Sequence, residues 1–245
     1  MTLDEVRRDW TRLGAEDPLW AVHMQPGKRG GRWDVEEFLR LGREDVAAAR
    51  AWLAELDLPT TWDRVLDFGC GAGRLSQALA GHAGQVVGVD VSEPMLETAR
   101  HLDRSDGRCE FLLNAEPHLG LFEDDRFDLV YSELVLQHLP LDAIEGYVAE
   151  FLRVLRPGGV AVLQCTTNPL WTAKGIVWRF VPRPVIRLAQ RRILRYPAPM
   201  RMTAYPPHRM AALVAANGGT VVATITEDRP ETHWRYSRYA VRANG

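Results

Sequence analysis

The sequence predicts an α/β fold with a doubly wound, mostly parallel sheet of about seven strands. From Trp62 to about Thr167, short apolar runs alternate with segments of helical character, an order typical of parallel strands joined by helical crossovers. The apolar runs are rich in Val and Leu and lack regular polar alternation, as in strands that are buried on both faces. Two further runs near the end of the chain complete the expected seven.

The expected elements follow one another in a regular order. Core strands are expected at Val65–Phe68, Gln85–Asp90, Glu110–Leu113, Phe127–Tyr131 and Val160–Thr166. Helices are expected between them at Arg74–Ala80, Pro94–Leu102 and Leu141–Leu155. Ser92 is expected to cap the second helix, because a serine before Glu93 and Pro94 fits the preferences of a helix start.

Two regions flank this core. Residues 1–60 are expected to form an N-terminal helical cap, with a helix at Val35–Leu56, and residues 61–245 the main domain. The main domain contains an insertion at about residues 168–206, which we interpret as a lid, because long irregular insertions are often lids. A helix at Pro207–Ala216 and two late strands at Thr220–Thr226 and His233–Arg242 follow.

The composition is that of a globular protein with an ordinary core. The chain has 245 residues, of which 46% are hydrophobic, and a net charge of −2, which gives no reason to expect nucleic-acid binding. The three cysteines form no C-x-x-C pair, so neither a disulfide framework nor a metal site is expected. The segment Met1–Trp10 is too charged for a signal peptide, and no apolar run reaches 18 residues. We therefore expect a cytoplasmic protein.

A glycine-rich loop, Gly69–Gly73, joins the first core strand to the first core helix. Glycine lets a ligand approach the backbone closely, and the helix N-terminus beyond it favours a carboxylate or a phosphate. The spacing is Gly-x-Gly-x-Gly, and Arg74 stands where a dinucleotide fingerprint has its third glycine. Asp67 before the loop would repel a pyrophosphate but can accept a hydrogen bond from an ammonium group. The pattern therefore favours a zwitterionic ligand.

Asp90 ends the next strand. In a doubly wound sheet, a carboxylate at this strand end lies where a ribose diol binds. The alternative interpretation is that the glycine loop is a structural turn and Asp90 only caps a helix.

Together these stretches resemble the class I S-adenosylmethionine-dependent methyltransferases, in their small-molecule branch. The matching stretches are Val65–Leu75, Val86–Leu96, Asn114–Glu116, Phe127–Pro140 and Leu152–Val162. They cover roughly residues 62–167, in the family's order, and are specific as a set. The resemblance implies S-adenosylmethionine as cofactor and a Rossmann-like sheet whose late antiparallel strand is His233–Arg242.

The resemblance also implies roles for individual residues. Those expected around the methionine part of the cofactor are Asp67, Phe68, Gly69, Cys70, Gly71, Gly73 and Arg74. Asp90 would bind the ribose hydroxyls, and Val91 would pack on the adenine.

Two later pairs of neighbouring residues carry the remaining implied contacts. Asn114 and Ala115 stand where the family usually has an Asp followed by a small residue that contacts the adenine amine, and an amide is a different partner from a carboxylate. Tyr131 and Ser132, at the end of the fourth strand, would face the methyl group.

His138 is the candidate general base, and Tyr131 is the second catalytic candidate. Methyl transfer from a sulfonium is a direct displacement that depends mainly on alignment, so a base is needed only where the acceptor keeps its proton at neutral pH. His138 follows the fourth strand, and the ordinary pKa of histidine suits proton transfer. The alternative is that His138 orders the loop before Pro140.

The candidate substrate-contacting residues are Trp20, Arg32, Trp33 and Glu133. The first three lie in the N-terminal region, which often closes over the cofactor in the family that this chain resembles. The alternatives are core packing for the tryptophans and a helix-start acid for Glu133.

The insertion has an unusual charge pattern. From Phe151 to Thr226 the chain contains eleven Lys or Arg residues and no Asp or Glu. Between Val185 and Arg195, arginines interleave with aliphatic residues, which indicates a basic amphipathic helix. Three interpretations stay open: a solvated lid face, an anion-gathering surface, and a contact with an anionic membrane.

The sequence therefore predicts methyl transfer from S-adenosylmethionine to an O, N or C nucleophile of a small metabolite, with anionic acceptors included. The alternatives are a membrane-surface lipid or quinone methyltransferase and a non-catalytic nucleotide-binding module. Asp67 and Arg74 disfavour a dehydrogenase, and Tyr131–Leu134 lacks the motif of DNA methylation. The expected partner is a small-molecule acceptor, with no nucleic acid and no metal. A membrane surface is an option that we do not favour, and the oligomeric state stays open.

Overall fold

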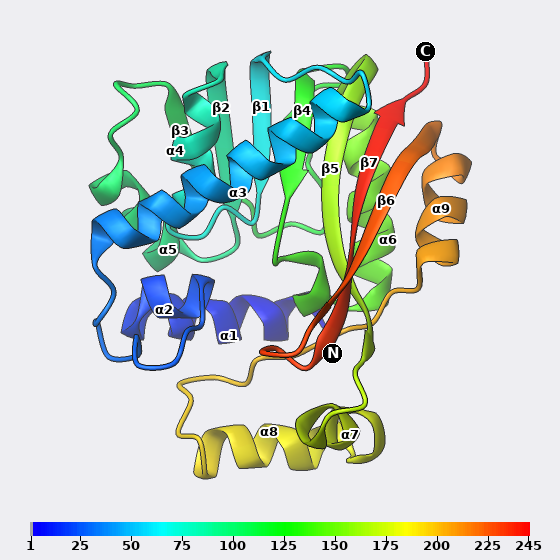
Figure 1. Cartoon of the computed structure of the whole chain (residues 1–245). Coiled ribbons are helices and arrows are strands. Elements are labelled where there is room, and N and C mark those ends of the chain that lie inside the picture. Colours follow the sequence, from blue (N-terminus) through cyan, green and yellow to red (C-terminus); the bar gives the residue numbers. More distant parts are fainter. Residues whose placement is uncertain (1) are drawn as a thin grey trace.

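The computed structural model describes residues 2–245 and contains the predicted seven-stranded sheet, in the order β3-β2-β1-β4-β5-β7-β6 (Figure 1). Its strands are β1 (Trp62–Phe68), β2 (Ala83–Asp90), β3 (Cys109–Leu113), β4 (Phe127–Ser132), β5 (Leu155–Pro169), β6 (Gly219–Arg229) and β7 (Trp234–Ala243). The first five strands pair in parallel, and β7 is antiparallel to both β5 and β6. The predicted fold class is confirmed, including its late antiparallel strand.

The helices lie on both faces of the sheet and beyond the carboxyl ends of its central strands (Figure 1). They are α1 (Leu3–Glu16), α2 (Pro18–Val22), α3 (Val35–Glu55), α4 (Arg74–Ala80), α5 (Glu93–Leu102), α6 (Leu141–Val154), α7 (Ala173–Phe180), α8 (Arg183–Arg192) and α9 (Pro207–Ala216), with a 3-10 turn, η1 (Leu136–His138). Ser92 takes the N-cap position of α5, but its side chain makes no capping hydrogen bond. Its hydroxyl donates instead to the carbonyl of Trp10, 3.3 Å away, so Ser92 ties α5 to α1.

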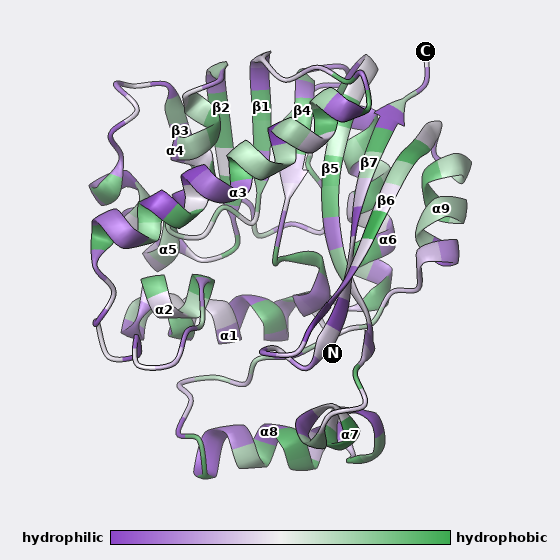
Figure 2. Ribbon diagram, in the orientation of Figure 1, coloured by the Kyte–Doolittle hydropathy of each residue, from purple (hydrophilic) through white to green (hydrophobic). Residues whose placement is uncertain are grey.

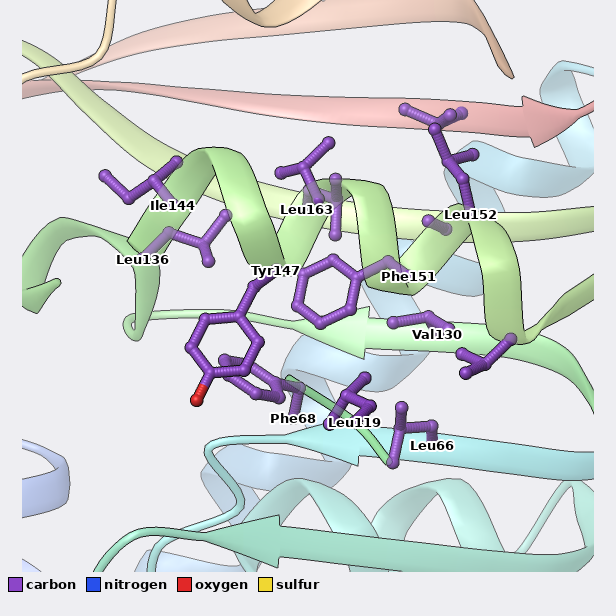
Figure 3. Packing of buried hydrophobic residues seen from close by; sticks show 14 of the residues in the cluster. Leu66, Phe68, Leu119, Val130, Leu136, Ile144, Tyr147, Phe151, Leu152 and Leu163 are labelled. Atoms are coloured by element: carbon purple, nitrogen blue, oxygen red, sulfur yellow. The ribbon is translucent and has the colours of Figure 1, made fainter. Parts of the chain in front are cut away.

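The sheet is apolar along the middle of its strands (Figure 2) and has a buried cluster on each face. On one face, Leu66 and Phe68 of β1 pack with Tyr147 and Phe151 of α6 (Figure 3). On the other face, Val65 of β1 packs in a cluster with residues of α3 and α4. Because successive side chains of a strand point to opposite faces, Asp67 lies on the α4 side and Phe68 on the α6 side.

The predicted N-terminal cap consists of two parts in the structure. Helix α3 lies against the sheet, where its Val46, Ala49 and Leu53 share a core cluster with β1 and β4. Helices α1 and α2 instead lie beyond the carboxyl ends of the central strands (Figure 1). The insertion contains α7 and α8, farther out at the same end of the molecule (Figure 1). Met1, in the predicted cap, lies outside the described residues, and among residues 2–245 no helix is long and apolar enough to cross a membrane.

Candidate functional site

A cavity lies between the carboxyl ends of the central strands and the helices α1 and α2. Its empty volume is about 860 Å³, part of which is open to solvent, and small-molecule sites commonly occupy several hundred Å³. The walls are Leu3, Val6, Trp10, Val22, Phe68, Gly69, Cys70, Gly71, Arg74, Leu75, Val89, Asp90, Val91, Met95, Asn114, Glu133, Leu134, Val135, His138, Leu139 and Tyr147. The lining is therefore largely apolar, with a few polar groups from β2, α4 and the segments after β3 and β4.

The glycine loop forms the floor of this cavity and requires its glycines. Gly69, Gly71 and Gly73 have φ values of +75°, +52° and +77°, in the left-handed region that favours glycine. A Cβ at Gly69 would lie 2.4 Å from Val135, and one at Gly71 would lie 2.6 Å from Val22. Conformation and space both exclude side chains here, so a ligand in the cavity meets bare backbone.

Arg74 supplies a buried cation at the cavity wall. It is the first residue of α4, and its side chain is 2% exposed. One Nη donates to Asp45 of α3, while the Nε–H has no hydrogen-bond partner among the described residues. A buried, unpartnered donor is costly, so this guanidinium is suited to receive an anionic group such as a carboxylate.

Asp90 presents a carboxylate at the end of β2. Its Oδ2 accepts from the backbone N–H of Gly71 and its Oδ1 from that of Ser92, both at 2.9 Å. Burial raises the pKa of Asp90 to about 6. Val91 and Asn114 lie on the cavity wall with it, and the Asn114 amide donates to the carbonyl of Glu116 at 3.4 Å. The carboxylate is anchored through one lone pair on each oxygen, which leaves further acceptor capacity for a diol.

Asp67 does not line the cavity, in contrast to its implied role beside the methionine. Its side chain is 1% exposed and accepts a hydrogen bond from the Ser76 hydroxyl of α4 at 2.6 Å. Burial raises the pKa of Asp67 to about 7. The hydrogen bond from Ser76 acts in the opposite direction and lowers this pKa. In the structure, Asp67 joins β1 to α4.

Replacing Asp67 with asparagine should stabilise the protein above neutral pH. A carboxyl with a raised pKa in the folded state binds its proton more tightly there than in the unfolded chain, so stability falls as pH rises from about 4 to about 7. Asparagine carries no charge and retains an acceptor for Ser76. Since one pKa unit corresponds to about 1.4 kcal/mol, the gain at pH 8 should be on the order of a few kcal/mol. Urea unfolding at pH 4.5 and pH 8 measures this, and an equal effect at both pH values would contradict it.

Tyr131 and Glu133 belong to one buried network. The Tyr131 hydroxyl donates to Glu133 Oε2 at 2.7 Å, and Arg238 of β7 donates to Glu133 Oε1 at 2.6 Å. Burial raises the pKa of Tyr131 well above its ordinary value. Glu133 reaches the cavity wall, but Tyr131 does not. Tyr131, which was predicted to face the methyl group, instead holds the Glu133 carboxylate in place by a hydrogen bond from outside the cavity.

His138 lines the cavity as a neutral imidazole. Its Nδ1 lies 2.7 Å from the carbonyl of Arg201, and because a carbonyl only accepts, Nδ1 carries the proton and Nε2 is the acceptor. Burial lowers the pKa of His138 to about 4. The Trp10 ring meets the imidazole edge-on at a centroid distance of 5.0 Å. The ring is thus held from two sides in its neutral form, and a pKa of about 4 makes Nε2 a weaker base than a histidine with its ordinary pKa.

The structure brings together only part of the predicted site. The predicted residues that line the cavity are Phe68, Gly69, Cys70, Gly71, Arg74, Asp90, Val91, Asn114, Glu133 and His138. Those that do not line it are Asp67, Gly73, Ala115, Tyr131, Ser132, Trp20, Trp33 and Arg32. Trp20 and Trp33 are packed in a buried cluster with Ala72 and Met95, and Arg32 is exposed. The structure thus favours core packing over a pocket role for the two tryptophans.

Eleven cavity residues were missing from the predicted site, and nearly all of them are apolar or aromatic. Leu3, Val6 and Trp10 line the cavity from α1, and Tyr147 lines it from α6. The first three are spaced by three and four residues, which is the period of an apolar helix face. That spacing marks a buried face of α1, but the sequence does not say that the partner of this face is a cavity.

Comparison with known proteins agrees with this geometry. Residues 66–163 match the model of a methyltransferase domain. The chain is 32% identical over 155 residues to 2-methyl-6-phytyl-1,4-hydroquinone methyltransferase of Synechocystis sp., a match that covers 63% of this chain and 48% of that protein. It is 37% identical over 113 residues to demethylmenaquinone methyltransferase of Clavibacter sepedonicus, over 46% of this chain and 45% of that protein. The chain therefore spans about half the length of these curated relatives.

A solved structure extends the likeness to the whole fold. Magnesium protoporphyrin IX methyltransferase from Synechocystis, crystallised with S-adenosylhomocysteine, superposes with a TM-score of 0.66 at 20% identity and covers 98% of both chains. The domain match and the sheet order agree. Residues 66–163 therefore match a methyltransferase domain, and the whole chain has the fold of a solved methyltransferase that was crystallised with S-adenosylhomocysteine.

Proposed function

We propose that this protein transfers the methyl group of S-adenosylmethionine to an O, N or C nucleophile of a small acceptor molecule. The observation that carries the proposal is one cavity that joins a bare glycine loop, the Asp90 carboxylate and the unpartnered Nε of Arg74. S-adenosylmethionine offers a complementary set of groups, namely a ribose diol, a carboxylate and a sulfonium. When bound, it supplies an activated methyl group.

Each chemical group of this cofactor has a suitable partner among the cavity residues. Asp90 would accept hydrogen bonds from the ribose hydroxyls, because its carboxylate is fixed by two backbone N–H groups. Arg74 would bind the amino-acid carboxylate, which pairs well with a guanidinium. Val91 and Asn114 would hold the adenine, with the Asn114 side chain replacing the carboxylate that is usual in the family.

His138 would remove the proton from a methyl acceptor whose nucleophilic atom is still protonated. Its Nδ1–H is engaged by the Arg201 carbonyl, which fixes the tautomer and leaves Nε2 free to act as a base. The apolar walls Leu3, Val6 and Trp10 would exclude water and hold the acceptor in line with the methyl group, which supplies much of the rate. For an acceptor that reacts without losing a proton, His138 would only position it.

A second candidate, methylation of a membrane-borne lipid or quinone, has support of its own. The two curated relatives above are named for hydroquinone and demethylmenaquinone substrates, and the cavity walls are mainly apolar. An apolar acceptor ring fits such a lining, whereas an anionic metabolite would need more cations than Arg74 offers there.

Transfer of a labelled methyl group to phenols, hydroquinones and carboxylic acids tests the proposal. We expect His138→Gln to lower kcat by about a hundredfold or more on a protonated acceptor, while the affinity for S-adenosylhomocysteine stays close to that of the wild type. His101→Gln, on the exposed face of α5, is the matched control. Failure of S-adenosylhomocysteine to bind in calorimetry would overturn the proposed function.

A further inference from the structure

The insertion exposes an unusual number of large apolar side chains. Of the thirteen exposed large hydrophobic residues in the described chain, eight lie between Trp171 and Leu194. Trp171, Phe180 and Ile193 are 74%, 67% and 76% exposed. Scattered exposed apolar residues are normal, but a concentration in one segment marks a contact surface.

Helix α8 presents an apolar side outward. Ile186 and Gln190 are buried against the protein, whereas Val185 and Leu188 are 53% and 58% exposed. A surface helix of a globular domain normally turns its apolar side to the core. Figure 2 shows apolar bands on both α7 and α8, which lie at the outer end of the molecule. Part of the apolar surface of α8 therefore has no partner within the described chain.

The same segment is strongly basic. Its cations are Lys174, Arg179, Arg183, Arg187, Arg191, Arg192 and Arg195, and no acid occurs between residues 151 and 226. Within residues 2–245, the only salt bridge recorded for this group joins Arg191 to Asp9 of α1, at 3.8 Å. The exposed apolar residues thus stand among cations that are mostly not neutralised by the protein.

We propose that the outer face of α7 and α8, which we call the basic apolar face, binds the surface of an anionic lipid bilayer. Its apolar side chains would enter the boundary between headgroups and acyl chains, and its cations would bind lipid phosphates. A second copy of this chain is a poor partner, because an isologous contact places the same cations opposite one another. Charge complementarity therefore selects the anionic bilayer.

The basic apolar face is tied to the cavity. Arg201, which follows α8, pairs with Glu5 and Asp9 of α1 at 3.0 and 2.9 Å, and its carbonyl accepts the hydrogen bond from His138. Helix α1 in turn forms a cavity wall. Binding at a bilayer would therefore bring the lipid surface to the end of the molecule that holds the cavity.

Co-sedimentation with vesicles tests this proposal independently of any methyl transfer. Vesicles of phosphatidylcholine with phosphatidylglycerol should sediment the full chain, and vesicles of phosphatidylcholine alone should do so at least tenfold more weakly. The double variant Lys174→Glu/Arg192→Glu should lose at least tenfold in affinity for the anionic vesicles. Arg64→Glu/Arg242→Glu, at exposed positions of β1 and β7 outside the insertion, makes the same charge change and should bind as the wild type does.

A second variant distinguishes the entry of apolar side chains into the bilayer from simple charge attraction at its surface. Phe180→Glu should weaken binding, whereas Leu121→Glu, at an exposed apolar site outside the insertion, should not. Brominated acyl chains should quench part of the tryptophan fluorescence in the wild type, and Trp171→Phe should remove most of that quenching. Equal binding by all charge variants, absence of quenching, or a stable dimer in light scattering that Leu188→Glu dissociates would overturn the proposal.

Discussion

Replacing Asp90 with alanine should weaken the binding of S-adenosylhomocysteine by about a hundredfold or more. The change removes the acceptor for the ribose hydroxyls and the two hydrogen bonds that hold the backbone at Gly71 and Ser92. A hydrogen bond to a charged group contributes about 1.5–3 kcal/mol, so loss of the ribose contacts alone corresponds to roughly a hundredfold in affinity. Calorimetric titration of both proteins with S-adenosylhomocysteine measures the effect.

The control for this experiment is Asp63→Ala, which removes an exposed carboxylate at the opposite end of the sheet. Asp90→Asn adds a finer comparison, because it keeps one acceptor oxygen and removes the charge. Its affinity should fall between those of the wild type and the alanine variant. An Asp90→Ala protein that binds as tightly as the wild type would show that the carboxylate does not hold the ligand.

The sequence predicts the glycine loop and the strand-end carboxylate of the site better than it predicts the other residues that line the cavity. The glycine loop and Asp90 could be placed because their roles depend on backbone geometry: a strand end, a left-handed turn and a helix start recur at fixed spacing. The end of β4 is harder, because residues that are neighbours in sequence there point in different directions. Tyr131 points into the layer between the sheet and α3, whereas Glu133 and His138 reach the cavity.

The N-terminal region illustrates a second limit. Trp20 and Trp33 look like pocket residues because they are aromatic and lie in a segment that closes over the sheet, but they pack in the core instead. Trp10 faces both His138 and the cavity. Periodicity identifies an apolar helix face, but which face meets solvent, core or ligand depends on contacts with residues more than a hundred positions away.

Replacing Arg238 with methionine should lower the free energy of unfolding by about 3–5 kcal/mol. The Glu133 carboxylate is 4% exposed and would lose the only cation that pairs with it among residues 2–245, and an unpaired buried charge is strongly destabilising. At this chain length, each kcal/mol shifts the Tm by roughly 2–4 °C, so calorimetry should show a decrease of about 6 °C or more. Arg43→Met, at an exposed position of α3, is the matched control and should change the Tm little.

The double variant Glu133→Gln/Arg238→Met then tests whether Arg238 stabilises the fold by neutralising the charge of Glu133. A neutral glutamine keeps an acceptor for the Tyr131 hydroxyl and needs no counter-charge, so most of the lost stability should return. If it does not return, the Arg238 side chain stabilises the fold through packing rather than through its charge. Glu133→Gln alone is the informative case for function, because Glu133 is the network residue that lines the cavity. A stable Glu133→Gln protein that binds cofactor normally but has lost methyl transfer would place Glu133 against the acceptor.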